Sequence, residues 1–87
     1  THGTDTMVET AKALQEVVSD KTIVLTGALE PALFKTSDAM FNIGCAIAAV
    51  QALPEGVYIT MNGRVFESNN VVKDLEKSRF VTLDELS

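Results

Sequence analysis

The stretch Thr22–Gly27, with the sequence TIVLTG, predicts a buried β-strand. Its run of β-branched and apolar residues ends in glycine, which often closes a strand. Near-continuous apolarity is typical of a strand covered on both faces, as in parallel sheets. Val57–Met61, with the sequence VYITM, predicts a second such strand. Two strands separated by a helix indicate a βαβ unit in which the strands run parallel.

One helix is predicted before the first strand in the sequence, and another after it. Over residues 5–18 apolar side chains recur at helical spacing, and Thr6-Met7-Val8-Glu9 fits a capping box. Further along, Ser37 or Asp38 is expected to cap a second helix that continues to about Leu53. This second helix is apolar almost all round, which is typical of a helix sandwiched between other elements.

The remaining third of the chain predicts antiparallel structure. Asn62-Gly63 is a strong signal for a two-residue hairpin turn, because asparagine and glycine tolerate the positive φ angles that such a turn requires. The chain would return from this turn as a short strand over residues 64–67. Residues 71–78 predict an irregular or helical polar segment, and residues 79–83 predict a last short strand.

The order of elements predicts an α/β fold. Alternating helices and strands are typical of a doubly wound, mostly parallel sheet of the Rossmann or flavodoxin type, with three layers, here followed by a C-terminal β-hairpin. Two parallel strands make a poor sheet by themselves. We therefore interpret residues 1–87 as one partial α/β domain that belongs to a larger sheet.

Composition excludes several classes of protein. Apolar residues make up 46% of the 87 residues and charged residues 22%, which excludes a disordered tail. One cysteine excludes an intramolecular disulfide framework, and no cysteine–histidine cluster offers a zinc site. The net charge is −5 with lysines and arginines scattered singly, which disfavours nucleic acid and anionic membranes as partners. We expect no cofactor, no metal and no membrane span, and a cytoplasmic protein.

Several polar residues could carry chemistry. Loops at the carboxyl ends of parallel strands hold the ligands of open α/β sheets, and helix-starting residues lie there. A threonine hydroxyl is a weak nucleophile that needs an adjacent base, such as a lysine. The competing interpretations are plain helix capping for the threonines and aspartates, and a solvated charge for the lysine. Cys45 is expected to be a buried, inert thiol, and His2 a loop histidine. The candidates are Thr4, Asp5, Thr6, Ser37, Asp38 and Lys73.

Five consecutive residues, His2-Gly3-Thr4-Asp5-Thr6, resemble the second active-site signature of the bacterial-type L-asparaginase family. The resemblance covers nearly the whole chain and is closest to the second half of compact single-domain asparaginase-like proteins. It also differs in places: Glu30-Pro31 stands where the family usually has Arg-Pro. The further resembling segments are Val24–Ala28, Ser37-Asp38, Phe41-Asn42, Gly56–Asn62 and Val71–Lys73.

The resemblance implies hydrolysis of L-asparagine to L-aspartate and ammonia by threonine chemistry. It makes Thr4 the family's second active-site threonine, Lys73 its hydrogen-bonding partner, and Asp5 the residue that binds the α-amino group of the substrate. Gly3 and Ala28 would contact the substrate, Ala28 through its backbone carbonyl. Thr4 and Lys73 would lie at the same sheet edge. The first threonine motif of the family is absent from these residues, so an upstream segment or another chain would supply it.

Two other hypotheses stay open. The chain could be a non-catalytic module that binds a small amino acid through Asp5 and a helix N-terminus. It could also act as an assembly module, because unpaired sheet edges are templates for pairing with another chain. The expected partners are a small amino-acid amide and further copies of the same chain in a homo-oligomer.

Overall fold

The computed structural model describes residues 3–29, 38–76 and 79–86. The expectations for His2, Ser37 and Glu30-Pro31 lie outside these residues. The elements follow one another as α1 (Met7–Val17), β1 (Thr22–Leu25), α2 (Ala39–Ala52), β2 (Gly56–Met61), β3 (Arg64–Glu67), β4 (Val72–Asp74), β5 (Arg79–Val81) and α3 (Leu83–Leu86).

The two predicted apolar strands pair in parallel, as expected. β1 lies beside β2 with Thr22 opposite Gly56 and Leu25 opposite Ile59. β3 then pairs antiparallel with β2 through the predicted two-residue turn, in which Asn62 has a φ of 54° and Gly63 a φ of 82°. In the part of the chain that the structure describes, this sheet has one parallel and one antiparallel pair. A larger doubly wound sheet therefore stays a prediction.

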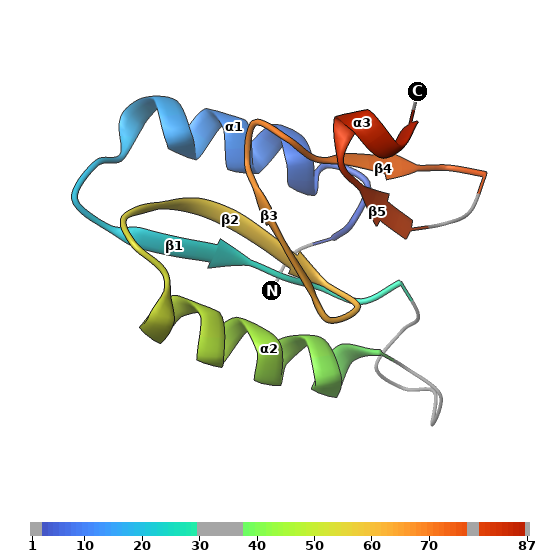
Figure 1. Ribbon diagram of the computed structural model, residues 1–87, viewed down its shortest axis with the longest axis horizontal. Coiled ribbons are helices and arrows are strands. Elements are labelled where there is room, and N and C mark those ends of the chain that lie inside the picture. The colour runs from blue at the N-terminus through green and yellow to red at the C-terminus, as the bar shows by residue number, and fades with distance from the viewer. Residues whose placement is uncertain (1–2, 30–37, 77–78, 87) are drawn as a thin grey trace.

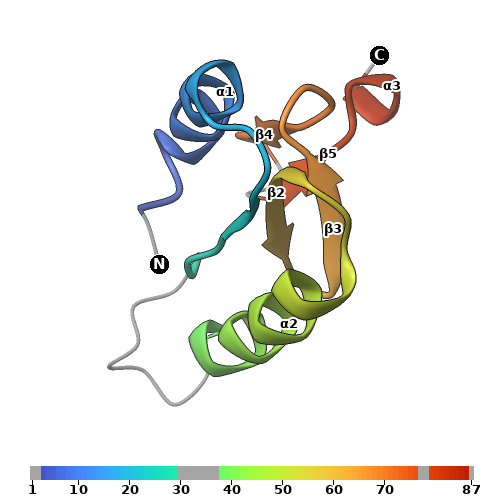
Figure 2. The same cartoon turned by 90° about the vertical axis from the view of Figure 1, so that its left-hand side faces the viewer.

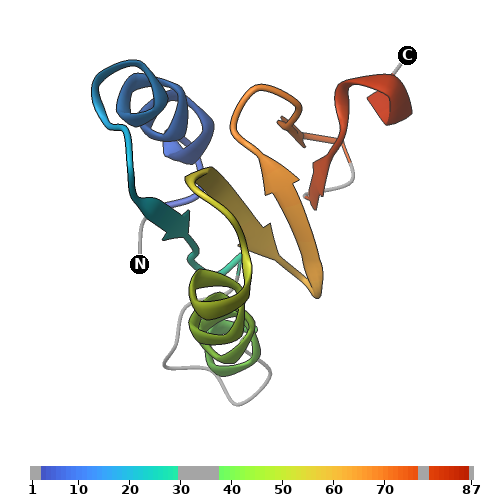
Figure 3. The same ribbon diagram turned by 60° about the vertical axis from the view of Figure 1, so that its left-hand side comes forward.

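Helices α1 and α2 lie on opposite sides of β1 and β2 (Figures 2 and 3). α1 turns Met7 and Ala11 onto the sheet, and both side chains are fully buried. This is the apolar stripe that the helical spacing predicted, since residues four apart share one helix face. The core between α1 and the strands consists of Met7, Ala11, Leu25, Val57, Ile59, Met61, Phe66, Val71 and Phe80.

Helix α2 differs from the prediction of a sandwiched helix. It packs on the sheet through Asn42 and Ala49, whereas Met40 is 81% exposed and Phe41 60% exposed. Cys45 is half-buried instead of buried. An apolar helix normally buries all of its faces. The outer face of α2 is thus apolar surface that no described residue of this chain covers.

The two predicted helix starts are confirmed in position but not in their side-chain caps, and one strand was missed. Thr6 and Asp38 occupy the N-cap positions of α1 and α2, but neither side chain caps its helix. Residues 72–74, expected in an irregular or helical segment, form β4, which pairs antiparallel with β5. The pairing of Lys73 with Phe80 explains this strand: a short polar segment gains its ladder from a neighbour later in the chain, which local propensity does not reveal.

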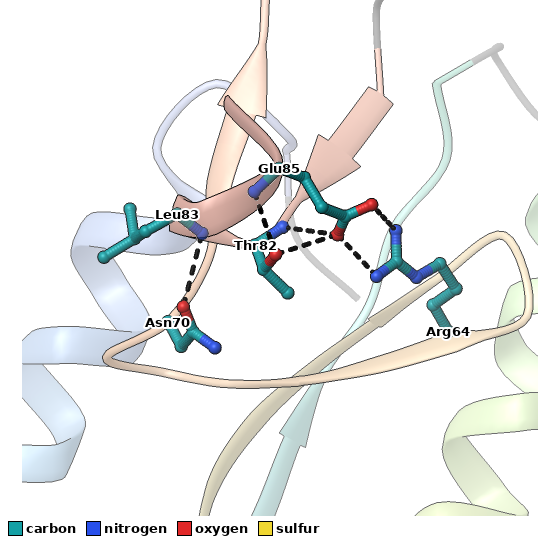
Figure 4. A network of polar contacts seen from close by, with 5 residues as sticks. All are labelled: Arg64, Asn70, Thr82, Leu83 and Glu85. Carbon is teal, nitrogen blue, oxygen red and sulfur yellow. Dashed lines mark hydrogen bonds and ion pairs between the residues drawn. The ribbon is translucent and has the colours of Figure 1, made fainter. Parts of the chain in front are cut away.

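A capping box forms at α3 instead. The Glu85 backbone N–H donates to Thr82 Oγ1 at 3.3 Å, and the Thr82 N–H donates to Glu85 Oε1 at 3.0 Å. The Glu85 carboxylate also accepts two hydrogen bonds from Arg64 on β3, at 2.6 and 3.0 Å, as Figure 4 shows. Leu83 N–H donates to Asn70 Oδ1 at 3.2 Å. These contacts fasten the last helix to the three-stranded sheet.

Acid titration tests the Arg64–Glu85 contact. Hydrogen bonds from Arg64, then from Thr82, lower the pKa of Glu85 from 4.5 to about 2. A carboxylate with a lowered pKa stabilises the fold above pH 4.5, and this contribution is lost as the pH falls toward 2. In Arg64→Ala we expect the pKa of Glu85 to rise only part of the way to 4.5, because Thr82 still donates to the carboxylate.

The measurement is an NMR titration of the Glu85 carboxyl carbon. Lys12→Ala, which removes an exposed cation on α1, is the matched control and should leave the Glu85 midpoint in place. An unchanged Glu85 midpoint in Arg64→Ala would contradict the contact.

Candidate functional site

Lys73 on β4 contacts the residues that precede α1. Its Nζ donates to Thr4 Oγ1 at 2.9 Å and to Asp5 Oδ1 at 2.7 Å, across sequence separations of 69 and 68 residues. The structure thus brings together Thr4, Asp5 and Lys73, which the sequence singled out. Thr6, the fourth candidate of this region, is exposed at the N-cap of α1.

The strand register explains why Lys73 points inward. Lys73 on β4 lies directly opposite Phe80 on β5, and side chains opposite one another in an antiparallel pair share a face. Phe80 is buried in the core, so the Lys73 side chain starts toward the core as well and is only 17% exposed. Its apolar stem is covered, while its ammonium reaches the residues that precede α1.

The charges in this cluster are unevenly covered. The Asp5 side chain is 89% exposed, in contrast to Lys73. The hydrogen bond from Lys73, and then its positive charge, lower the pKa of Asp5 below its usual value. An ion pair with one partner this exposed contributes little to stability, because water screens it. Asp5 therefore presents a carboxylate that is ionised at neutral pH and open to a ligand on its outer side.

A hollow of about 490 Å³ adjoins the cluster, between the first turns of α1 and β4. Asp5 and Lys73 contribute its polar atoms together with Glu9 and Lys12. A second hollow, of about 260 Å³, lies at the amino end of β2 around Gly56. We favour the first as a ligand site, because α/β sheets bind ligands at the carboxyl ends of their strands. The lining of the first hollow is Asp5, Val8, Glu9, Lys12, Val72, Lys73 and Leu75.

The segment after β1 is held in place on each side of Ala28. Thr26 Oγ1 donates to the Thr60 carbonyl at 2.8 Å, which ties this segment to β2. The Gly27 carbonyl accepts from Asn42 Nδ2 at 2.8 Å. The Leu29 N–H donates to both carboxylate oxygens of Asp38, at 3.0 and 3.1 Å. These hydrogen bonds connect residues 26–29 to β2, to α2 and to the residue that precedes α2.

Two of the predicted substrate contacts do not line the hollow. Ala28 is half-buried in the segment after β1, and Gly3 is exposed ahead of Thr4. Neither belongs to the described residues that line the hollow beside Lys73. A Cβ added at Gly3 would meet nothing within 4 Å among the described residues, so the space next to it is open.

Asn42 is the residue that the sequence reasoning missed. Asn42 lies on α2 and is completely buried. Its side-chain amide forms hydrogen bonds with three segments. It donates to the Gly27 carbonyl and to Asp38 Oδ2, and it accepts from the Asn62 N–H at 2.9 Å. The signal that could have found it is a lone asparagine on an otherwise apolar helix. Buried amides are nearly always fully hydrogen-bonded, so such a residue organises the segments around it.

Within residues 3–29, 38–76 and 79–86, no three histidine, cysteine, aspartate or glutamate residues gather closely enough to hold a metal ion. In the same part of the chain, no helix has the length and apolarity needed to cross a membrane.

Comparison with known proteins agrees with the resemblance in the sequence. The chain is 40% identical over 79 residues to the glutaminase-asparaginase of Acinetobacter glutaminasificans, covering 86% of this chain and 24% of that protein. It is 39% identical over 77 residues to a probable periplasmic L-asparaginase of Haemophilus influenzae, covering 84% of this chain and 22% of the relative. The chain therefore spans about a quarter of the length of these relatives.

A solved structure agrees in fold. The probable cytoplasmic L-asparaginase from Campylobacter jejuni superposes with a TM-score of 0.84 at 37% identity, over 95% of this chain and 28% of that one. One of these proteins is named as periplasmic and another as cytoplasmic, so a cytoplasmic location of this chain stays a prediction. The family model for the N-terminal domain of asparaginase matches residues 1–84. The chain belongs to the asparaginase family.

Proposed function

We propose that this chain forms part of an asparaginase-type amidohydrolase that converts L-asparagine to L-aspartate and ammonia. The observation that carries the proposal is the pair of hydrogen bonds from Lys73 Nζ to Thr4 Oγ1 and Asp5 Oδ1, within a segment that the family model matches. The bridge contributes little to stability, because Asp5 is exposed. The placement of a lysine, a threonine and an aspartate together is therefore better explained by a function than by stability.

In the proposed reaction a threonine oxygen forms an ester bond with the side-chain carbonyl carbon of asparagine. The C–N bond breaks, ammonia leaves with the hydroxyl proton, and water then hydrolyses the ester. Thr4 and Lys73 supply one hydrogen-bonded threonine–lysine pair for this chemistry. The family's first threonine motif, which this sequence lacks, would come from an upstream segment or another chain.

Asp5 has a separate role in this proposal. Its ionised carboxylate would bind the α-ammonium group of the amino acid, because charge-assisted hydrogen bonds are the strongest of their kind. The lowered pKa of Asp5 supports this role, since the carboxylate then keeps its charge well into the acidic range. Gly3 and Ala28 would complete the ligand contacts through their backbones.

Calorimetry separates binding from catalysis. In Asp5→Ala we expect the affinity for both asparagine and aspartate to fall about 10- to 100-fold, the loss typical of a charged hydrogen bond. Thr4→Ala should leave both affinities within about threefold, because Thr4 is proposed to act on the amide and not on the α-ammonium group. Asp5→Asn, which keeps the shape of the side chain, is the matched control for the charge.

The same variants distinguish the competing function, a non-catalytic amino-acid-binding module. That reading predicts that Asp5→Ala abolishes binding, while Thr4→Ala changes neither binding nor any turnover of asparagine. Unchanged binding in Asp5→Ala would contradict both readings of this site.

A further inference from the structure

We propose that Asp38 and Asn42 are positioning residues that aim the backbone carbonyl of Ala28 at the side-chain amide of the ligand. This inference rests on the proposed function, in which Ala28 contacts the substrate. It assigns to two side chains outside the Thr4–Asp5–Lys73 cluster the selection of asparagine over aspartate.

The geometry of the peptide bond carries the argument. The Ala28 carbonyl and the Leu29 N–H belong to the same planar peptide unit, and in a trans unit they point in opposite directions. No cis peptide bond occurs among the described residues. Asp38 accepts the Leu29 N–H with both carboxylate oxygens, so it fixes the plane of that unit. The Ala28 carbonyl must then point away from Asp38.

The preceding peptide unit is fixed as well. Asn42 Nδ2 donates to the Gly27 carbonyl at 2.8 Å, and the Gly27 carbonyl shares its plane with the Ala28 N–H. Both peptide units that flank the Ala28 Cα are therefore held by side chains of α2. Rotation about the two backbone torsions of Ala28 would break one of these hydrogen bonds.

Asp38 and Asn42 are themselves braced. Asn42 Nδ2 donates to Asp38 Oδ2 at 3.0 Å, and Asn42 Oδ1 accepts the N–H of Asn62 in the β2–β3 turn. Asn42 is fully buried, so its amide cannot exchange these partners for water. The network links the segment after β1, the start of α2 and the hairpin turn. All three lie at the same edge of the sheet (Figure 1).

The charge of Asp38 also affects how strongly the Ala28 carbonyl accepts a hydrogen bond. A carboxylate that accepts the N–H of a peptide unit polarises that unit, because neighbouring hydrogen bonds strengthen one another in a low dielectric. The Ala28 carbonyl thereby becomes a better acceptor. The carboxamide of asparagine has N–H groups to donate to such an acceptor, whereas the ionised side chain of aspartate has none. The network thus favours the amide over the acid.

The test measures the ratio of the affinities for asparagine and aspartate by calorimetry on the 87-residue chain. In Asp38→Ala we expect the preference for asparagine to fall about 3- to 10-fold, the loss of one hydrogen bond, while the affinity for aspartate changes little. Asp38→Asn keeps one acceptor for the Leu29 N–H and should restore part of the preference. Hydrogen exchange at the Leu29 amide should become faster in Asp38→Ala.

Gln15→Ala is the matched control, because Gln15 Oε1 accepts from the Val57 N–H and from Ser68 Oγ in a similar network at the opposite sheet edge. It should leave the ratio unchanged, and protected β2 amides in each variant show that it is folded. An equal loss of both affinities in folded Asp38→Ala, or an unchanged ratio, overturns this inference alone. If the unaltered chain binds neither amino acid, the proposed function fails and this inference falls with it.

Discussion

The 87-residue chain by itself is expected to hydrolyse asparagine at least about a thousandfold more slowly than a complete asparaginase, because removing one member of a nucleophile–base unit costs orders of magnitude in rate. Its sequence contains the Thr4–Lys73 pair, which belongs to the family's second threonine motif, but not the first threonine motif of the family. Ammonia release at saturating asparagine, measured beside a full-length family member, checks this result.

A matched variant identifies the source of any residual rate. Lys73→Met keeps the length and the apolar stem of the side chain but removes the donor to Thr4 and Asp5. If a slow rate arises at this site, Lys73→Met should abolish it, while Lys21→Met, which alters an exposed residue between α1 and β1 that does not line the hollow beside Lys73, should not. Turnover by the unaltered chain that approaches the rate of a complete enzyme would refute the expectation that the family's first threonine motif is needed.

Local chemistry explains which parts of the fold could be predicted. The parallel pairing of β1 with β2 follows from two apolar β-branched runs separated by a helix. The hairpin follows from Asn62-Gly63, because few other dipeptides tolerate two positive φ angles. β4 could not be predicted in the same way, since Val72–Asp74 is short and polar and becomes a strand only by pairing with β5.

Capping shows a second limit of local reasoning. Asp38 occupies an N-cap position, but its carboxylate binds the N–H of Leu29, nine residues earlier, instead of the first turn of α2. The choice between a local and a distant donor depends on tertiary structure. At Thr82 the local choice wins, and Glu85 completes a capping box there. Composition favours aspartate and threonine at such positions without revealing which donor each will bind.

The candidate site could not be predicted from the spacing of residues in the sequence alone. Thr4 and Lys73 are 69 residues apart, so periodicity gives no reason to join them, and plain capping is a competing interpretation of Thr4. Family resemblance supplied the pairing, and the structure shows the contact. Asn42 had no assigned role, because a buried asparagine is recognised by its partners, and these lie on three different segments.

The exposed face of α2 relates to the length of the chain. Met40, Phe41, Ile47 and Val50 are between 43% and 81% exposed on a helix that the sequence marks as buried. Natural sequences place such apolar faces against other elements. The chain spans 24% of the Acinetobacter relative and 28% of the Campylobacter structure that it matches. Further structure of the family's domain, or further copies of the chain, is the expected cover, and a homo-oligomer stays a prediction.

The second large effect is expected in the core. Ile59 lies on β2, the middle strand of the three-stranded sheet, and is completely buried in the core cluster. Ile59→Ala should lower the free energy of unfolding by about 2–5 kcal/mol, through lost burial and the cavity left behind. A small domain has roughly 5–15 kcal/mol in total, so this variant should lose a large fraction of its stability. Urea unfolding followed by circular dichroism measures the loss.

Val65→Ala on the neighbouring strand β3 is the matched control, because Val65 is 48% exposed and lies opposite Thr60 in the same sheet. Its cost should stay below about 1 kcal/mol, as for other substitutions near the surface. Equal losses in the two variants would show that β2 is not the centre of the core. The site should fail together with the fold in Ile59→Ala, since β2 carries Thr60, whose carbonyl anchors Thr26 two residues before Ala28.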